Sequence, residues 1–455
     1  MARAAAAPPR AVRHAPDYAL LSVVAMLVVL GLVFVYSSSY ALGYAQFADA
    51  NYFIKRQALF AVAGAAGLVI AMNLDYHHLR AISPLLMLAA LIGLAAVLVP
   101  GIGMEANGAR RWIQFGTLPG VQPSEFAKLA VLVYMSAWLA AKGAVVKDFS
   151  LGVFPFVSMV GIVGALIMLE PDLGTAVMVA VITGTLFFVA GARIRHVLAL
   201  GASGLLMLVV LILSGGYRMD RILSFTSAES DPSGVGFHTI QLLVAFGSGG
   251  IGGLGLGVSR QKFFYVPGSH TDGVLAIVGE ELGLIGVTVV LGLFVVLLWR
   301  GWQIVRRAAD PFGSLLAVGV MAWLGFQMLI NVGGVIRLFP LTGIPLPLVS
   351  YGGSSLIATL FAVGLLLSVS RYAQLDAKER AAPVRGALRA PAPRPSAPGT
   401  RRSSRTPAAA RAVTPTRRLR SPSGCASVST RSSSTTGPST DRSAPSPSRR
   451  ASRTA

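Results

Sequence analysis

The chain has 455 residues, of which 54% are hydrophobic and 13% are charged, whereas ordinary soluble domains carry about 25% charged residues. This composition excludes a soluble globular protein, because such a chain would expose large apolar patches to water. The net charge of +21 is mostly a property of one segment, since residues 381–455 hold fifteen Arg and one acid and contribute +14. The single cysteine, Cys425, lies in the same segment and excludes a disulfide framework or a cysteine-based metal site.

Apolar stretches recur from Tyr18 to Tyr372, and each is long enough to supply the roughly 20 helical residues that cross a bilayer core. We interpret the first stretch as a membrane helix rather than a signal peptide, because no clear small-residue cleavage site follows it. The sequence therefore predicts an all-α, polytopic integral membrane protein with about ten transmembrane helices and a large extracytoplasmic loop before the eighth. The spans are predicted at residues 18–38, 55–73, 81–99, 123–141, 151–169, 173–191, 196–214, 273–299, 313–335 and 350–371.

The distribution of Lys and Arg predicts the orientation of these spans. An even number of spans places both ends on one side, and the positive-inside rule makes the side with excess Lys and Arg cytoplasmic. We therefore expect a multi-pass protein of the cytoplasmic (inner) membrane, with both termini cytoplasmic and the acid-bearing loops facing outward. The expected parts are a cytoplasmic N-terminal segment (1–17), a transmembrane domain (18–375) and a disordered basic cytoplasmic tail rich in Arg, Ser, Pro and Ala (376–455).

Three predicted outer loops, residues 100–122, 215–271 and 343–355, break the apolar pattern. Gly and Pro at membrane depth need protein or water around them, so we expect these loops to fold back into an outward-facing cavity. The glycine-rich piece FGSGGIGGLGLG, residues 246–257, is not a nucleotide-binding loop, because no strand precedes it and no GK[ST] ends it. Close packing of re-entrant backbone is the expected role of its glycines.

Clusters of ionisable residues stand at the predicted outer ends of helices, where such groups are costly and are candidates for function. In the first cluster, RRWI is followed by QPSEFAKLA, in which Pro123 and an N-cap at Ser124 suit a helix start. Glu125 and Lys128 are spaced i, i+3 and share one helix face. They form either a self-satisfied ion pair or, together with Arg111, a polar wall that meets an anion. The concentration of charge at one helix end favours the wall.

Two further clusters admit structural explanations. In LEPDLGTA, Pro171 breaks one helix and Asp172 can cap the next, whereas Glu170 has no such role. In YRMDRILSF and SRQKFFYVP, cations alternate with aromatic residues. This pattern is typical of an interfacial belt and equally of a docking surface for an anionic, amphiphilic ligand, so both interpretations stay open. The cations concerned are Arg218, Arg221, Arg260 and Lys262.

The fourth cluster, HTDGVLAIVGEELG, places three acids within ten residues of an apolar run. Thr271 and Asp272 lie at the predicted start of a helix, where N-capping is one explanation of Asp272. Glu280 lies about 12 Å further along that helix and within about 80° of Asp272 around it, which capping does not explain. We expect Asp272 at the mouth of an outward cavity, Glu280 deeper on a similar side, and Glu281 paired with another helix.

The sequence contains no evident metal-binding motif, since it has no HExxH and no cluster of His residues. The acids could hold a hard divalent cation such as Mg²⁺ or Mn²⁺, but their spacing does not require one. We therefore predict no certain cofactor. No Ser-His-Asp set can be assigned from sequence order.

Taken together, these motifs resemble the SEDS family, which includes FtsW, RodA and SpoVE. The resemblance covers residues 18–372 and rests on RRWI, QPSEFAKLA, EPDLGT, SRQKFFYVPGSHTD, IVGEELG and PLTGIPLPLVSYGGSS. It implies ten transmembrane helices and a peptidoglycan glycosyltransferase that polymerises lipid II at the outer face of the membrane. The order of motifs and the QKFFYVP loop are more similar to FtsW than to RodA, which implies a role in cell division.

The resemblance also implies roles for individual residues. The acceptor, the 4-hydroxyl of the GlcNAc sugar on lipid II, needs a base, and Asp272 of the HTD motif is the expected catalytic residue. The leaving undecaprenyl pyrophosphate needs cationic stabilisation, for which Arg111, Lys128 and Lys262 are candidates. The residues expected to bind substrate are Arg111, Glu125, Lys128, Lys262, His270, Glu280 and Ser350.

The implied partners are lipid II, the nascent glycan strand, a class B penicillin-binding transpeptidase, other divisome proteins and membrane lipids, and nucleic acid is not expected. The chain departs from the family at Gly273, where an aromatic residue is usual, and at Gly268 and Ser269, where Glu-Ala is usual. It also carries Arg337 where small residues are common. These departures bear on the rim of the site or on partner contacts more than on the reaction.

Three alternatives to an FtsW-like polymerase remain open from the sequence. One is a RodA-like polymerase of cell elongation. A transporter that flips lipid II would carry charges along a path through the bilayer, whereas here the charges cluster at the predicted outer side. A non-catalytic division scaffold would tolerate changes at the outer acids without loss of activity. The charge distribution favours the glycosyltransferase.

Overall fold

The structure is a computed structural model that describes residues 14–106, 109–114, 116, 119–214, 217–231, 234 and 236–372. The chain divides into two units, Met1–Pro383 and Val384–Ala455, and the described residues all belong to the first. The predicted tail (376–455) and most of the predicted N-terminal segment (1–17) therefore lie outside the described residues.

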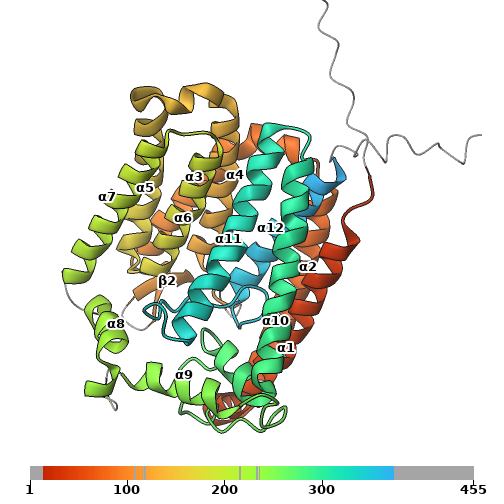
Figure 1. The fold of residues 1–455 in the computed structure, drawn as a ribbon, viewed down its shortest axis with the longest axis vertical. Coiled ribbons are helices and arrows are strands. Elements are labelled where there is room, and N and C mark those ends of the chain that lie inside the picture. Colours follow the sequence, from red (N-terminus) through yellow and green to blue (C-terminus); the bar gives the residue numbers. More distant parts are fainter. Residues whose placement is uncertain are drawn as a thin grey trace, which may run out of the picture. The chain divides into compact units, whose positions relative to one another are not determined.

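Helices dominate the described part of the chain (Figure 1). Nine of the helices described there are long and apolar enough to cross a membrane. The sixth predicted span forms a shorter apolar helix, α6, of 17 residues. Each of the ten predicted spans coincides with a helix, which confirms a polytopic α-helical membrane protein. The ten helices are α1 (Tyr18–Phe47), α2 (Tyr52–Asn73), α3 (Tyr76–Leu98), α4 (Pro123–Lys142), α5 (Phe154–Leu169), α6 (Leu173–Val189), α7 (Ile194–Leu213), α10 (Val274–Arg307), α11 (Pro311–Val335) and α12 (Gly353–Arg371).

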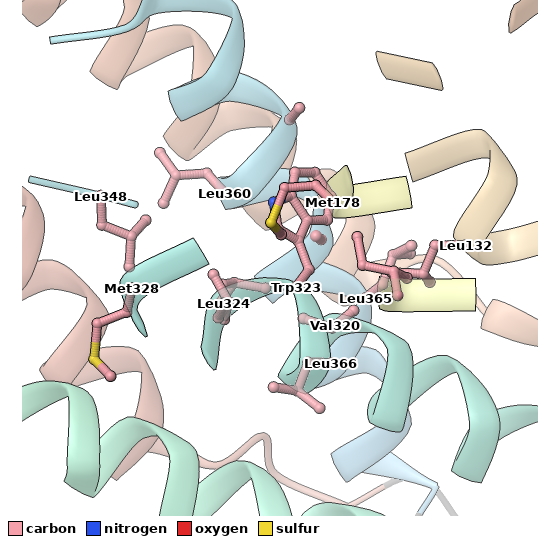
Figure 2. Close-up of a cluster of buried hydrophobic side chains, with 14 of the residues drawn as sticks. Leu132, Met178, Val320, Trp323, Leu324, Met328, Leu348, Leu360, Leu365 and Leu366 are labelled. Atoms are coloured by element: carbon pink, nitrogen blue, oxygen red, sulfur yellow. The ribbon is translucent and has the colours of Figure 1, made fainter. Parts of the chain in front are cut away.

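The centre of the helix bundle is built around α11 and α12. Trp323 of α11 is fully buried, and Figure 2 shows it among side chains from α4, α6 and α12, including Leu132, Met178 and Leu365. Small residues let neighbouring membrane helices approach closely. A Cβ at Gly364 of α12 would lie 2.6 Å from the carbonyl oxygen of Leu68, so α2 and α12 pack backbone against backbone.

The glycine-rich segment packs against a break in α10, which confirms close packing of re-entrant backbone. Gly283 has φ 65° and ψ −162°, a non-helical conformation inside α10 that suits glycine. The broken turn exchanges backbone hydrogen bonds with the segment, from Leu254 N to Glu280 O at 2.9 Å and from Leu284 N to Gly250 O at 2.9 Å. A Cβ at Gly249 would lie only 1.9 Å from a carbonyl oxygen of α10, so a side chain there is excluded.

Two of the three predicted outer loops contain secondary structure, and their elements lie at one end of the bundle (Figure 1). The first loop forms the antiparallel pair β1 (Gly103–Ala106) and β2 (Ala109–Ile113). The second contains α8 (Tyr217–Thr226), the short helix η3 (Ala228–Ser230) and α9 (Phe237–Ser248), which the sequence did not predict. Between α4 and α5 the chain forms two further short helices, η1 (Gly143–Lys147) and η2 (Phe149–Val153).

Two N-cap predictions concern helices that begin near this end of the bundle; the one for α4 is wrong and the one for α6 is confirmed. Gln122, not Ser124, is the N-cap of α4, because Pro123 already occupies its first turn. The Ser124 hydroxyl instead accepts a hydrogen bond from the Gln122 side chain at 3.1 Å. Asp172 caps α6 as predicted, since its carboxylate accepts the backbone N–H of Thr175 at 3.0 Å.

Candidate active site

A cavity of about 620 Å³ lies where α2, β2, α4, α6, α8, the chain segment before α10 and the start of α12 meet. Its wall is mixed, with apolar side chains such as Phe60, Trp112 and Met178 beside polar ones. Among the described residues, four cations and three carboxylates line it, an unusual density of charge for a chain of this composition. They are Arg56, Arg111, Lys128, Arg221, Glu125, Asp172 and Asp272.

Asp272 lies in a rigid turn rather than at a helix cap. Gly273 is the N-cap of α10 and makes no side-chain capping bond, so the carboxylate of Asp272 is not used to start the helix. The Gly268 carbonyl accepts the backbone N–H groups of Thr271 at 2.9 Å and of Gly273 at 3.1 Å. Asn331 of α11 donates to the Asp272 carbonyl at 3.0 Å. The turn is therefore fixed on both sides.

The carboxylate of Asp272 projects from this turn into the cavity. Its Oδ1 accepts the Thr271 hydroxyl at 3.0 Å, and within the described residues its Oδ2 has no hydrogen-bond partner. The residue is only 9% exposed. A nearly buried carboxylate with one unused oxygen can accept a proton from a bound hydroxyl.

Glu125 and Lys128 form a buried ion pair in the first turns of α4 and also line the cavity. The distance between Lys128 Nζ and Glu125 Oε2 is 2.9 Å, and Nζ lies 4.9 Å from the centre of the Trp323 ring. The ion pair expected from the i, i+3 spacing is therefore present. Because the same two residues face the cavity, the ion pair and the polar wall coexist.

Arg111 of β2 is anchored to the turn between α5 and α6. Its Nε donates to the Glu170 carbonyl at 3.1 Å, and a second guanidinium nitrogen donates to the Pro171 carbonyl. The side chain of Glu170 is fully buried, and neither carboxylate oxygen has a hydrogen-bond partner among the described residues. Burial raises the pKa of Glu170 to about 8, with a further rise from Asp172 and an opposing effect of Arg111.

The structure corrects the expected place of Glu280. The predicted angle between Glu280 and Asp272 requires one helix from Asp272 onward, but α10 begins at Val274 and the Asp272 carboxylate belongs to the preceding turn. The Glu280 carboxylate accepts the Ser259 hydroxyl and the backbone N–H of Arg260, the latter at 2.9 Å. It binds the chain after α9 and does not line the cavity.

Lys262 also lies away from the cavity, because it pairs with Glu281. Their side chains are fully buried, with Nζ 2.8 Å from Oε1. Glu281 accepts the hydroxyl of Ser37 on α1 at 2.6 Å, which confirms that it pairs with another helix. Lys262 further donates to the Gly257 carbonyl at 2.6 Å. Since Lys262 is committed to these acceptors, it has no access to a ligand in the cavity.

His270 and Ser350 support the cavity wall from behind without lining it. The His270 ring lies between Phe53 and Tyr351, with ring centres 4.6 and 5.4 Å away. Burial lowers the pKa of His270 to about 4, so the ring is neutral. The Ser350 hydroxyl accepts the backbone N–H of Leu346 at 3.0 Å, which fixes the turn before α12.

Two cavity cations differ from the sequence expectation. Arg221 of α8, for which a belt and a docking surface were both open, lines the cavity and donates to the Leu341 carbonyl at 2.9 Å. Arg56, in the first turns of α2, was not identified from sequence. The sequence feature that could have identified it is a cation near an aromatic residue at the predicted outer end of a span. The Arg56 guanidinium lies 4.5 Å from the centre of the Tyr52 ring. The side chain of Arg218 lies outside the described part.

The described residues contain no group of three or more His, Cys, Asp or Glu side chains that could hold a metal ion. Of the three cavity carboxylates, Glu125 pairs with Lys128 and Asp172 accepts from Thr175, so only Asp272 has an unused oxygen among the described residues. The residues present do not fit a divalent-cation site of several carboxylate ligands, so no catalytic step is assigned to a metal.

Fold and cavity together define a polytopic membrane protein with a charged cavity at one end of its helix bundle. The family described as cell cycle protein, FtsW/RodA/SpoVE, matches residues 18–375. Stage V sporulation protein E of Bacillus subtilis (strain 168) is 46% identical over 362 residues, which cover 80% of this chain and 99% of that protein. A probable peptidoglycan glycosyltransferase FtsW of Geobacter metallireducens is 43% identical over 356 residues, covering 78% and 94%.

Solved structures agree with this assignment. A chain in "Structural coordination of polymerization and crosslinking by a peptidoglycan synthase complex" is 32% identical, with a TM-score of 0.65, covering 80% of this chain and 99% of that chain. The rod shape determining protein RodA of Thermus thermophilus is 31% identical, with a TM-score of 0.58 and the same coverage. This chain therefore belongs to the FtsW/RodA/SpoVE family, the SEDS family that its motifs resemble.

Proposed function

We propose that this protein polymerises lipid II into glycan strands and that Asp272 is the general base of the reaction. Relatives at 43% and 41% identity over most of the chain are named peptidoglycan glycosyltransferases, so the enzyme class is peptidoglycan glycosyltransferase. The observation that carries the assignment of the base is the carboxylate of Asp272, held on a rigid turn in a cavity with four cations.

The reaction needs one proton acceptor and one stabilised leaving group. Asp272 Oδ2 takes the proton of the acceptor 4-hydroxyl while the hydroxyl oxygen forms a bond to the anomeric carbon of the donor sugar. The bond between that carbon and the pyrophosphate oxygen breaks, and undecaprenyl pyrophosphate leaves with the bonding electrons. Cations fixed in the cavity stabilise the charge that develops on this group. Arg111 and Lys128 lie in the cavity wall and remain candidates for this stabilisation. Lys262 is buried in its pair with Glu281 and is no longer a candidate.

We infer that the cavity faces outward and that both termini are cytoplasmic. In support, α4 begins at the cavity and carries Lys142 in its last turn. Likewise α10 begins beside Asp272 and ends with Arg306 and Arg307. An excess of Lys and Arg marks the cytoplasmic side. Lipid-linked donor and acceptor would then reach the cavity from the outer leaflet of the cytoplasmic membrane.

The biological setting that we propose is cell division, with a class B penicillin-binding transpeptidase and other divisome proteins as partners. Relatives named FtsW support this setting, while other relatives are named stage V sporulation protein E and RodA. The related chain from a peptidoglycan synthase complex supports a partner that crosslinks the polymer. A RodA-like role in elongation is the alternative within the same enzyme class.

The test is polymerisation of lipid II by the purified protein, with and without its class B partner, comparing wild type with Asp272→Ala. The proposal predicts glycan product from wild type and none from an equally folded variant. Equal product from both would remove Asp272 from the mechanism. If neither protein makes product with the partner present, the proposed polymerase activity is contradicted and the alternative of lipid II transport is favoured. Flipping assays in vesicles measure that transport directly.

A further inference from the structure

The imidazole ring of His238 is held against the turn that carries Asp272. His238 lies in the first turn of α9 and is half-buried. A hydrogen bond joins its ring to the backbone of Pro267, and because proline has no N–H group the acceptor is the Pro267 carbonyl. The next residue, Gly268, fixes the Asp272 turn, since its carbonyl accepts two backbone N–H groups of that turn.

The packing of α9 brings the same helix face onto this turn. Leu242 lies four residues after His238 and therefore shares its face of the helix. A Cβ at Gly273 would lie 3.1 Å from the Leu242 side chain, and a Cβ at Gly268 would lie 2.6 Å from Asp272 Oδ1. The imidazole and the carboxylate thus surround one short piece of backbone, close enough for the charge of Asp272 to act on the ring.

The two ring nitrogens of His238 have different surroundings. Nε2 is buried and has no hydrogen-bond partner among the described residues. The hydrogen bond to Pro267 therefore comes from Nδ1, which carries the proton. In a neutral imidazole the other nitrogen is an acceptor. A buried acceptor without a donor is costly, so Nε2 is an acceptor whose donor is absent from this state of the site.

The imidazole is neutral at pH 7 and above. Burial lowers the pKa of His238 from its usual 6.5, and the positive charge of Arg221 lowers it further. The carboxylate of Asp272 and the hydrogen bond to Pro267 act in the opposite direction without reversing the shift. The tautomer with its proton on Nδ1 is therefore the working form of the ring.

Other described carboxylates on the elements packed against α9 have partners of their own. They are Glu229 with Arg337, Glu280 with Ser259, and Glu281 with Lys262. Helix α11, which also touches α9, carries no ionisable residue. Among the described residues, Asp272 and Arg221 are therefore the charged groups to which His238 responds.

We propose that Nε2 of His238 accepts a hydrogen bond from the carboxyl group of Asp272 once Asp272 has taken a proton from the substrate. While Asp272 is ionised, both groups are acceptors and no hydrogen bond can join them. Proton transfer to Asp272 creates the O–H donor that Nε2 lacks. An interaction that forms only as the proton is transferred stabilises the transition state more than the ground state.

This proposal rests on the proposed function, in which Asp272 is the general base. His238 acts through Asp272 and does not line the cavity, so it is a positioning residue. Once its own ring is protonated, Nε2 can no longer accept a hydrogen bond. The imidazolium charge also stabilises the ionised carboxylate and makes Asp272 a weaker base. The structure therefore assigns to His238 a share of the loss of activity at acidic pH.

The first test is the rate of lipid II polymerisation by the full chain with its class B partner. His238→Phe keeps a ring but removes the acceptor. It should lower kcat about tenfold, the size expected for one hydrogen bond, and leave KM nearly unchanged because the bond forms only in the transition state. His238→Gln supplies an amide carbonyl as acceptor and an N–H group for Pro267, so its rate at pH 7.5 should stay within about threefold of wild type.

His196→Phe is the matched control. His196 is also a half-buried histidine with a buried, unpartnered ring nitrogen, but it lies at the start of α7 beside Phe149. It should polymerise like wild type. An unchanged kcat in His238→Phe, or an equal loss in His238→Phe and His238→Gln, would overturn the proposal.

The pH profile decides if His238→Phe does not fold. Below about pH 6.5 the wild-type rate should fall more steeply than that of His238→Gln, because only wild type gains an imidazolium beside Asp272. A merely structural role for His238 would shift both profiles by the same factor at every pH. Parallel profiles would therefore overturn the proposal.

Nuclear magnetic resonance of the full chain with ¹⁵N-labelled histidine tests the site without the reaction. The His238 signals, assigned by their loss in His238→Gln, should show a neutral ring protonated on Nδ1 above pH 7. Asp272→Asn supplies an N–H donor and removes a negative charge. It should move the Nε2 signal and shift the titration of His238 to lower pH. A proton on Nε2, or signals that do not respond to Asp272→Asn, would overturn the proposal.

These outcomes are separable from those of the proposed function. Signals of His238 that respond to Asp272→Asn in a protein that makes no glycan would retain the contact and contradict the polymerase. Glycan synthesis at the wild-type rate by His238→Phe, with signals that ignore Asp272→Asn, would retain the polymerase and contradict the role of His238.

Discussion

Two buried Lys–Glu pairs with similar distances serve different parts of the molecule. Lys262 and Glu281 are fully buried, and Ser37 and the Gly257 carbonyl complete their hydrogen bonds. Lys128 and Glu125 line the cavity, and Glu125 Oε2 has no well-oriented hydrogen bond although Lys128 Nζ is 2.9 Å away. A sealed, satisfied pair holds the fold together, whereas a partly satisfied pair beside a cavity can respond to a substrate.

The largest expected effect is the loss of folding in Lys262→Met. Removing one member of a buried pair leaves an uncompensated charge and costs about 3–5 kcal/mol. We expect a large fall in thermal stability and in the yield of folded protein, measured by melting in detergent. The double variant Lys262→Met with Glu281→Leu should recover much of the loss, since it leaves no charge unpaired. A single variant as stable as wild type would contradict the structural role of the pair.

Lys128→Met should instead act mainly on the reaction. Loss of one donor that stabilises developing charge typically costs about 100-fold or more in rate. Polymerisation per folded molecule should fall by about this factor, and the loss of stability should be smaller than in Lys262→Met because the cavity admits water to Glu125. If stability falls equally in both variants and the remaining folded Lys128→Met is fully active, the two pairs do not differ as described.

Gly268 should control the position of the Asp272 carboxylate. A Cβ at Gly268 would lie 2.6 Å from Asp272 Oδ1 and 2.8 Å from the Thr271 hydroxyl. Gly268→Ala should therefore displace the carboxylate and lower the polymerisation rate about tenfold, since small misplacements of catalytic groups are costly. The measurement is the rate at saturating lipid II.

Gly257→Ala is the control for backbone strain in the same loop. Both glycines have positive φ, 66° at Gly268 and 82° at Gly257, but a Cβ at Gly257 would contact nothing within 4 Å. Both variants should lose similar stability from the unfavourable φ, and only Gly268→Ala should lose activity. Equal activity losses in the two variants would show that strain, not carboxylate position, is responsible.

The smallest expected effect concerns Glu170 and pH. Its pKa is raised from 4.5 to about 8 in the folded protein, so the folded state binds the proton more tightly than the unfolded state. This carboxyl therefore costs no stability below about pH 4.5, costs more as the pH rises, and reaches its full cost above about pH 8. Glu170→Gln should melt higher than wild type by an amount that grows between pH 5 and pH 8.5. A difference independent of pH would contradict the raised pKa.

The sequence predicted the membrane helices well because hydropathy reports the bilayer environment directly. It did not predict α8 and α9, since both lie between polar and glycine-rich stretches and are too short to show a span. It predicted the packing of the glycine-rich segment, because repeated glycines have few other roles in an apolar chain. The break of α10 at Gly283 is a consequence of that packing and is not visible in the local sequence.

Within the site, the sequence correctly identified four residues that line the cavity, namely Asp272, Glu125, Lys128 and Arg111. It misplaced Glu280, because a helical wheel drawn along one helix cannot show that another segment of the chain donates to the carboxylate. It misplaced Lys262, because the sequence of the loop does not show that this cation pairs with the buried Glu281. Arg56 was missed for a related reason. Its place in the cavity wall follows from the packing of α2 against α12, which the local sequence does not show.

The most direct test compares two carboxyl groups of one sequence motif, those of Asp272 and Glu280, in one assay. Asp272→Asn and Glu280→Gln each replace a carboxylate by an amide of the same shape, and polymerisation of lipid II is measured per folded molecule with the class B partner present. We expect no detectable product from Asp272→Asn and a rate close to wild type from Glu280→Gln, because, of these two residues, only Asp272 faces the cavity. Full activity of Asp272→Asn, or loss of activity in folded Glu280→Gln, would contradict it.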